Sequence, residues 1–413
     1  MGIVICDRII MFFLCLMIFF LPISKAVIEV SAIFCILLWV IKHLLRLKDS
    51  LRNGNSCVSL RGIKDSLFCR IDINSMLTIF IFANFLSILF SSNIKLSINA
   101  FFLKLIEYIL IFIIVKDAVN SKLRYKLITG VILSSLFFIS LDGFYQIITK
   151  QDLFRHRNLF QGRVTASFIN PNDLGSYLIT VIPLVLSLVF VDFGKKIKLI
   201  LIAVSLISIS ALMFSFSKGA WVAFLIALLF WGLRIKKRYI LYVFLGILVT
   251  GLILPVFFKF SSVDLIRRLS SFSNDAGAID RKYLWQAAMR MFLYKPAFGV
   301  GLGTFMENYQ KFWVKPTMHI AYAHNCYLQT LAETGIIGLG AFLLFLFIWM
   351  KHTLKVLAMP SRSLFYFSFL GLSIGLIAYL LNSFVDTNFY SLPIATLFWF
   401  ILGLQQAAGI IIK

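Results

Sequence analysis

The sequence predicts an all-α polytopic membrane protein with about twelve transmembrane helices. Of its 413 residues 61% are hydrophobic, and the mean hydropathy is +0.94, well above that of soluble domains. Apolar stretches of about 15–22 residues recur along the whole chain, the length needed to cross roughly 30 Å of hydrocarbon. Short basic segments separate alternate pairs of these stretches. Together these observations indicate a bundle of membrane spans.

We expect the spans to follow one another as a single integral membrane domain over residues 1–413. No small-residue cleavage site follows the apolar run Met11–Leu21, so this run is expected to be the first span and not a signal peptide. The twelve expected spans are 9–23, 26–45, 75–91, 99–115, 127–148, 172–191, 197–214, 219–233, 239–258, 334–350, 364–385 and 391–412.

Lysine and arginine predict the orientation of the bundle. Short basic segments face the cytoplasm by the positive-inside rule, so both termini are expected there, in agreement with an even number of spans. The basic segments are 46–74, 116–126, 194–198, 234–238 and 351–362.

Two segments on the opposite, periplasmic side are also basic. The segment 149–171 carries four Lys/Arg and one Asp, and the long segment 259–323 carries nine Lys/Arg and four Asp/Glu. Long loops escape the positive-inside rule, but short ones do not. A basic surface on this face therefore suggests a bound anion, and the alternative is a solvated loop that attracts lipid headgroups. We expect 259–333 to form one long loop on this side that contains amphipathic helices.

Several kinds of chemistry lack their sequence patterns. The five histidines show no ligand spacing, there is no Asp-x-Asp pair, and no glycine-rich loop ends in Lys-Ser or Lys-Thr. We therefore expect no metal, no ATP hydrolysis and no cofactor.

The first polar interruption on the periplasmic side precedes the sixth span. Asn170-Pro171-Asn172-Asp173 is typical of a turn and helix start, with Asn172 or Asp173 expected as the cap. A plain helix entrance explains these residues, but it does not explain the charge of Arg163 just upstream.

The second interruption is the short junction Ser217-Lys218-Gly219 between the seventh and eighth spans. The ammonium group of Lys218 can point at an anion at headgroup level. Alternatively, it can snorkel to lipid phosphate.

The third interruption is an expected amphipathic helix inside the long loop. Leu284, Trp285, Ala288, Met291 and Phe292 recur at helical spacing. Arg281 lies one turn before Leu284 and Trp285, where a guanidinium can bind a diphosphate bidentately. The helix is expected to end at Lys295-Pro296, and the glycines of 299–303 favour a sharp return.

The fourth interruption is the segment that begins at His324-Asn325. If 324–338 were one helix, Leu328, Leu331, Gly335 and Gly338 would share a face with His324, and Glu333 would lie on the opposite face. A lone histidine is more often structural than catalytic. Beside a basic periplasmic surface, however, its imidazole fits the role of a general base.

These residues resemble a known family. His324-Asn325, followed after nine residues by Gly335-Ile-Ile-Gly338, is similar to the pattern of bacterial O-antigen ligases and of the related O-antigen and exopolysaccharide polymerases. The resemblance extends to Arg281-x-x-x-Trp285 and to the glycine-containing return. It also covers the Asn170-Pro171-Asn172 entrance and the Ser217-Lys218-Gly219 junction, and so spans roughly 160–340.

The resemblance implies a metal-independent glycosyltransferase of the GT-C type at the periplasmic face of a Gram-negative inner membrane. It implies transfer of O-antigen polysaccharide from undecaprenyl diphosphate to the lipid A-core oligosaccharide. His324 corresponds to the essential histidine of the family. Arg281 corresponds to an arginine that binds the donor diphosphate, with Arg163 as a further candidate. A third family arginine falls on Lys218, which keeps the charge but loses the planar fork. Asn325, Trp285, Gly335 and Gly338 are expected to support the site.

Two rival functions remain from the sequence. A polymerase would use the same donor and a lipid-linked glycan as acceptor. A transporter would place its charges near the bilayer midplane, where Lys104 and Glu107 in the fourth span are the exception. The length of the chain and its single large loop favour a ligase. The expected partners are the two lipid-linked substrates and membrane lipids, with no nucleic acid. The sequence does not specify the oligomeric state.

Overall fold

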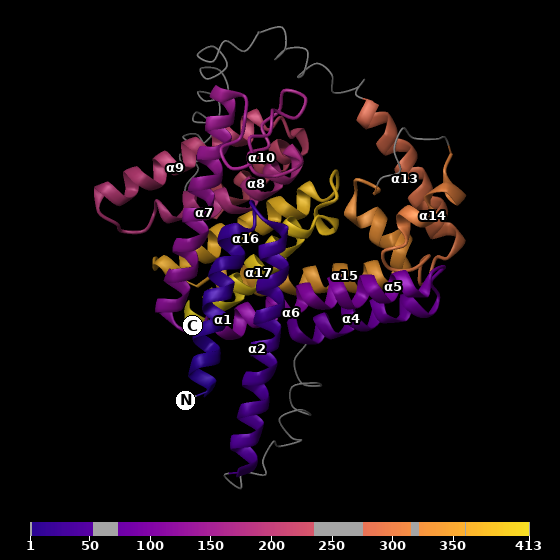
Figure 1. Cartoon of the computed structure of the whole chain (residues 1–413), viewed down its shortest axis with the longest axis horizontal. Coiled ribbons are helices and arrows are strands. Elements are labelled where there is room, and N and C mark those ends of the chain that lie inside the picture. The colour runs from indigo at the N-terminus through magenta and orange to yellow at the C-terminus, as the bar shows by residue number, and fades with distance from the viewer. Residues whose placement is uncertain (1, 53–72, 235–275, 315–321, 360, 413) are drawn as a thin grey trace. The chain divides into compact units, whose positions relative to one another are not determined.

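Helices make up nearly all of the regular secondary structure in the residues that the structure, a computed structural model, describes (Figure 1). In those residues the only strand-like pairings are two isolated β-bridges, of Gln151 with Asn158 and of Phe160 with Arg163. The prediction of an all-α protein is therefore confirmed for the described residues. These are 2–52, 73–234, 276–314, 322–359 and 361–412.

Nine helical segments in these ranges are long and apolar enough to cross a membrane. Two other expected spans, 75–91 and 219–233, correspond to shorter apolar helices, and the expected span 239–258 lies outside the described residues. The protein is thus a multi-pass membrane protein, and the number twelve stays a prediction. The long segments are α1 (Gly2–Phe20), α2 (Lys25–Arg52), Ile94–Ala118, α7 (Lys122–Thr149), α8 (Pro171–Leu188), α9 (Lys195–Phe214), α15 (Cys326–Leu357), α16 (Leu364–Asn382) and α17 (Leu392–Ile412).

Contacts divide the chain into two compact units. The first unit consists of Met1–Phe13, Ala32–Ile114 and Asp280–Met359. In it α4 (Ile73–Leu89) packs along α15, with Phe80 contacting the rings of Phe342 and Phe345 at centroid distances of 5.4 and 6.4 Å. Its further elements are α5 (Ile94–Ala100), the π-helix η1 (Phe101–Ile106), most of α6 (Glu107–Ala118), most of α13 (Ala276–Tyr294) and α14 (Phe305–Phe312).

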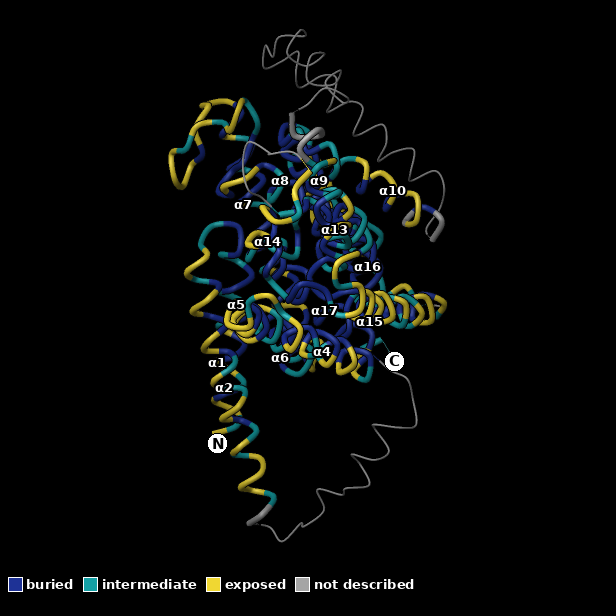
Figure 2. Tube along the Cα trace, turned by 90° about the vertical axis from the view of Figure 1, so that its right-hand side faces the viewer, coloured by how far each residue is buried: buried dark blue, intermediate teal, exposed yellow. Residues whose placement is uncertain are grey.

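The second unit consists of Leu14–Ser31, Val115–Ile279 and Pro360–Lys413. Its centre is the pair α8 and α16, which pack closely at Gly371. A glycine is needed there, because a β-carbon would collide with the backbone of Pro183 and Leu184. Almost every residue of α8 and α17 is buried (Figure 2). The unit also holds α7, α9, α10 (Lys218–Arg234) and the 3₁₀ turn η2 (Asn388–Tyr390).

The start of α8 corrects one expectation. The cap is Asn170, whose side chain accepts a hydrogen bond from the backbone N–H of Asn172 at 2.9 Å, and not Asn172 or Asp173. Pro171 occupies the first helical position, where a missing N–H costs nothing and φ is already helical. The polar residues at 170–173 therefore do form a capped helix entrance, with the cap two or three residues earlier than expected.

Candidate active site

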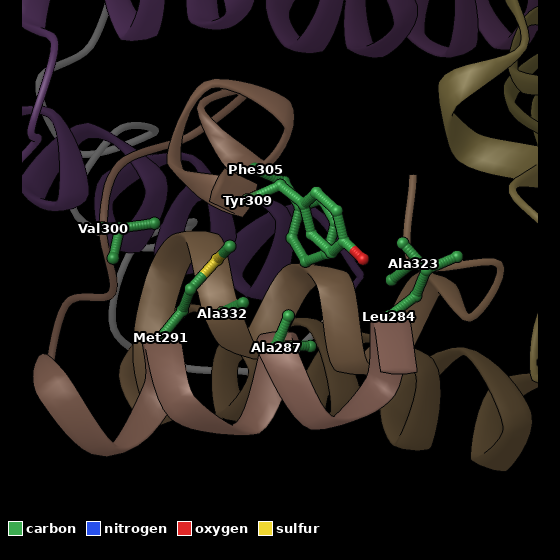
Figure 3. Packing of buried hydrophobic residues seen from close by; sticks show 9 residues of the cluster. Leu284, Ala287, Met291, Val300, Phe305, Tyr309, Ala323 and Ala332 are labelled. Carbon is green, nitrogen blue, oxygen red and sulfur yellow. The ribbon is translucent and has the colours of Figure 1, made fainter. Parts of the chain in front are cut away.

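Helix α13 packs against α14 and α15 through a small apolar core, as the spacing of its apolar residues predicts. Leu284, Ala287, Ala288 and Met291 are buried on one side of α13. They face Phe305 and Tyr309 of α14 (Figure 3). The rest of the cluster is Val300, Ala323 and Ala332. This core fixes α13 relative to the segment that precedes α15.

Arg281 lies in α13, one turn before Trp285, and is half-buried. Within the described part of the chain it makes no hydrogen bond or ion pair. Two basic residues toward the other end of this helix differ: Arg290 donates to the carbonyl of Trp313 at 3.0 Å, and Lys295 donates to the carbonyl of Phe90 at 2.5 Å. A half-buried guanidinium is costly without an acceptor, so Arg281 is suited to an anion brought by a ligand.

His324 is held directly in front of α15. Its backbone has the left-handed φ of 48°, which is uncommon outside glycine but better tolerated by Asn, Asp and His. Asn325 caps the helix by accepting hydrogen bonds from the backbone N–H groups of Tyr327 and Leu328, both at 3.0 Å. Trp285 of α13 donates its indole N–H to the carbonyl of Ala323 at 2.9 Å. The expected supporting residues Asn325 and Trp285 thus contact the backbone on either side of His324.

Tyr322 lies two residues before His324 and is a second titratable side chain in this segment. Burial, and then the negative charge of Glu333, raise the pKa of the Tyr322 hydroxyl above its usual range. Tyr322 therefore stays protonated at neutral pH and does not compete with His324 for the role of base.

The glycine-rich return, residues 296–305, packs against a break in α15. Gly299, Gly301 and Gly303 all have positive φ, as the expected sharp turn requires. Gly335 has φ 66° and ψ −168°, so the assumption of one continuous helix over 324–338 is wrong. A β-carbon at Gly335 would collide with the backbone of Ala297.

Backbone hydrogen bonds join the glycine-rich return to α15 at this break. The N–H of Ile336 donates to the carbonyl of Pro296 at 2.9 Å, and the N–H of Gly301 donates to the carbonyl of Glu333 at 2.9 Å. Leu328 remains in the helical turns that follow His324, whereas Gly335 is the non-helical residue at which those turns end, and Gly338 lies beyond the break. The segment that packs closely against Gly335 is the start of the glycine-rich return, at Ala297 and Phe298, and not a second helix.

Glu333 and Gln329 are site residues that sequence reasoning missed. Both side chains are fully buried. The Glu333 carboxylate accepts hydrogen bonds from the N–H groups of Gly303 (2.9 Å) and Phe305 (3.2 Å) and from Nε2 of Gln329 (3.2 Å). Oε1 of Gln329 accepts the N–H of Ala323 at 3.0 Å. The only sequence signal is the spacing of four residues, which places the two side chains on one helix face.

Arg163 lies in the second unit, between the starts of two helices. It donates Nε to the carbonyl of Ser215 at 2.8 Å and Nη2 to Oδ1 of Asn172 at 2.6 Å. Two other arginines of the basic segment 149–171 bind backbone groups of their own unit: Arg155 donates to the carbonyl of Ile23, and Arg157 donates to the carbonyl of Ser167. Part of the basic charge of this segment therefore stabilises the fold.

Lys218 is the first residue of α10 and is half-buried. The partial positive charge of a helix N-terminus repels a cation, and an anion bound there would be attracted by both the helix dipole and the ammonium group. The adjoining Phe216 has a φ of 48°, and a β-carbon at Gly219 would lie 2.5 Å from Val385. The start of α10 thus fits closely against the end of α16, which fixes the backbone at Lys218.

Two carboxylates of the second unit, Asp173 and Asp386, interact with each other, and no pattern in the sequence indicates this pairing. Oδ2 of Asp173 accepts the hydroxyl of Ser391 at 3.0 Å, and the buried Asp386 is close enough to Asp173 to interact electrostatically. They are separated in sequence by 213 residues. In the part of the chain that the structure describes, no group of three or more His, Cys, Asp or Glu is arranged to hold a metal ion.

Arg281, His324, Trp285, Asn325, Gly335 and Gly338 lie in the first unit, and Arg163 and Lys218 lie in the second. A helical multi-pass protein with a histidine and an arginine on packed elements outside its apolar runs is a candidate membrane transferase. Residues 202–343 match a family model described as O-antigen ligase, which confirms the resemblance drawn from the motifs. The match covers about a third of the chain and indicates a function of the O-antigen ligase or polymerase type, that is, a glycosyltransferase-type activity. No curated protein matches the chain. The matched range includes Lys218, Arg281 and His324 but not Arg163.

Proposed function

We propose that this protein is an O-antigen ligase. In this proposal it transfers polysaccharide from undecaprenyl diphosphate to the lipid A-core oligosaccharide at the periplasmic face of a Gram-negative inner membrane. Both termini are cytoplasmic, and the loop 259–333 carries the catalytic segment. One observation supports it most strongly. Trp285, one turn after the half-buried Arg281, donates to the carbonyl of Ala323, the residue before His324.

The reaction is a substitution at the anomeric carbon of the donor sugar. An acceptor hydroxyl attacks this carbon, His324 takes the proton of the hydroxyl, and the bond between the carbon and the diphosphate oxygen breaks. The departing undecaprenyl diphosphate keeps the bonding electron pair. A sugar hydroxyl is a weak nucleophile, so a neutral imidazole as base accelerates the attack.

Fixed cations stabilise the charge that develops on the leaving diphosphate. Arg281 is assigned to this role because it is half-buried without an acceptor among the described residues. Lys218 is assigned to it by the family resemblance. Arg163 is a further candidate because its charge lies in the basic segment 149–171.

The lipopolysaccharide profile of a strain that lacks this protein tests the proposal. A ligase predicts bare lipid A-core together with accumulation of lipid-linked polymer. Core that carries at most one repeat unit would instead show a polymerase, and an unchanged profile would contradict both. Transfer between purified donor and core acceptor in proteoliposomes is the matching positive test, and it excludes transport as the only activity.

A further inference from the structure

The backbone at His324 is held from both sides by side chains outside the reaction. The left-handed φ of 48° at His324 persists only if its neighbours are fixed. Asn325 is fixed as the cap of α15. Ala323, which is fully buried, has both of its backbone polar groups bound by side chains: Trp285 donates to its carbonyl, and Gln329 accepts from its N–H.

The amide of Gln329 can serve Ala323 in one orientation only. Its oxygen must face the N–H of Ala323, because its NH₂ group would present donor to donor. Its Nε2 then points at Glu333 and donates to Oε1 at 3.2 Å. The carboxylate oxygens of Glu333 already accept backbone N–H groups, so they face Gln329 as acceptors and impose this orientation on it.

Glu333 is itself fixed by the glycine-rich return. It accepts the N–H groups of Gly303 and Phe305, and its own carbonyl accepts the N–H of Gly301. An unbroken chain of hydrogen bonds therefore runs from the return through Glu333 and Gln329 to Ala323. Burying a carboxylate is costly, and an apolar pair would fill the same volume without that cost. Packing alone therefore does not explain Gln329 and Glu333.

We propose that Gln329 and Glu333 are positioning residues that hold His324 at its working geometry through the backbone of Ala323. The proposal rests on the general-base role given to His324 above. Both residues act through the backbone of Ala323 and not on the reacting atoms. Their effect is on orientation, where a shift of about 1 Å can cost about a hundredfold in rate.

Gln329→Met is the first test variant, because it keeps the volume and removes both hydrogen bonds of the amide. In reconstituted protein, kcat per folded molecule should fall about tenfold or more, while KM for the lipid-linked donor changes less than about twofold. Thr334→Val is the matched control: it removes a different buried polar group of α15, a hydroxyl that bonds only to the carbonyl of Thr330 among the contacts described. Its kcat should remain that of the parent.

An exchange of the two side chains gives a second test. Gln329→Glu alone brings two carboxylates together, and Glu333→Gln alone points an NH₂ group at a backbone N–H, so each should lower kcat. In the double variant the carboxylate at position 329 can accept from the N–H of Ala323, and the amide at position 333 can donate to that carboxylate. The double variant should therefore recover kcat relative to Gln329→Glu, because it removes the contact between two carboxylates, whereas its NH₂ group at position 333 still faces a backbone N–H as in Glu333→Gln. No recovery relative to Gln329→Glu, together with unchanged thermal stability, would overturn the proposal.

Hydrogen exchange measured by mass spectrometry keeps the proposal testable whatever the activity. In Gln329→Met the peptide that contains Ala323–Asn325 should exchange faster than in the parent, and peptides of α16 should not change. Unchanged exchange of the peptide that contains Ala323–Asn325, or unchanged kcat per folded molecule, would overturn the positioning role. If the parent protein transfers no glycan, the proposed function fails instead, and the exchange result still decides the role of Gln329.

Discussion

The indole N–H of Trp285 lies 2.9 Å from the carbonyl oxygen of Ala323. This bond joins α13, which carries Arg281, to the residue that precedes His324. The donor-binding candidate and the candidate base therefore lie on elements that are fixed to each other inside one unit. A family pattern that contains Arg281, Trp285 and His324 has a physical reason in this bond.

Trp285→Phe should lower the rate of glycan transfer roughly fivefold to tenfold, because it leaves a buried carbonyl without its donor while most of the ring contacts remain. The rate in proteoliposomes at saturating donor measures the effect. Trp39→Phe makes the same chemical change in α2 and should leave the rate unchanged. Equal rates for all three proteins would show that this bond does not position the site.

Much of the structure of α13 and of the segments that pack against it could be predicted from the sequence. The apolar spacing of α13 and the stop at Lys295-Pro296 are local signals, and α13 indeed ends at Tyr294. The break at Gly335 could not be predicted, because a glycine inside an apolar run is equally compatible with a continuous helix. The links of Glu333 and Gln329 to backbone groups depend on the return of the chain from 296 to 305, and periodicity carries no information about that return. At α8, the proline at the first helical position does indicate Asn170 as the cap, but the neighbouring Asn172 and Asp173 obscure it.

His324→Asn should abolish transfer while the protein still inserts and accumulates. Asparagine tolerates the left-handed backbone of this position, so the variant removes the imidazole with little added strain. His324→Ala should also be inactive, but it adds a backbone penalty, so the Asn variant isolates the chemistry. Protein amount in the membrane and transfer by the purified variant are the two measurements. Transfer at the parental rate by His324→Asn would rule out the general-base role.

Gly335→Ala should destabilise the protein by about 3 kcal/mol or more, because only glycine adopts this backbone readily and the new methyl group would meet the backbone of Ala297. Gly340→Ala is the control in the same helix, since nothing lies within 4 Å of its added β-carbon. That change should be neutral or should stabilise by up to about 1 kcal/mol. Thermal unfolding in detergent compares the two, and similar melting temperatures would mean that the break at Gly335 tolerates a side chain.

Arg281→Lys should weaken the use of donor substantially, because a point charge cannot reproduce a forked contact with a diphosphate. The effect should appear mainly in KM for the lipid-linked donor or in kcat/KM. Arg290→Lys is the matched control on the same helix, where an exposed arginine donates to the carbonyl of Trp313. If Arg281→Lys behaved like this control, the diphosphate contact would have to be assigned to another residue.

Lys218 decides whether a simple charge replaces the family arginine. If its ammonium group serves the donor phosphates, Lys218→Arg should retain most activity and Lys218→Ala should lose most of it. If it only anchors α10 at the level of the lipid headgroups, Lys218→Ala should stay active, since Gly219 already fits α10 closely against Val385. We expect the first outcome, because the family that the chain resembles also has a basic residue at this position. The assay uses purified lipid-linked donor and core acceptor with a chelator and no added metal, and strict dependence on a divalent ion would contradict the metal-independent mechanism.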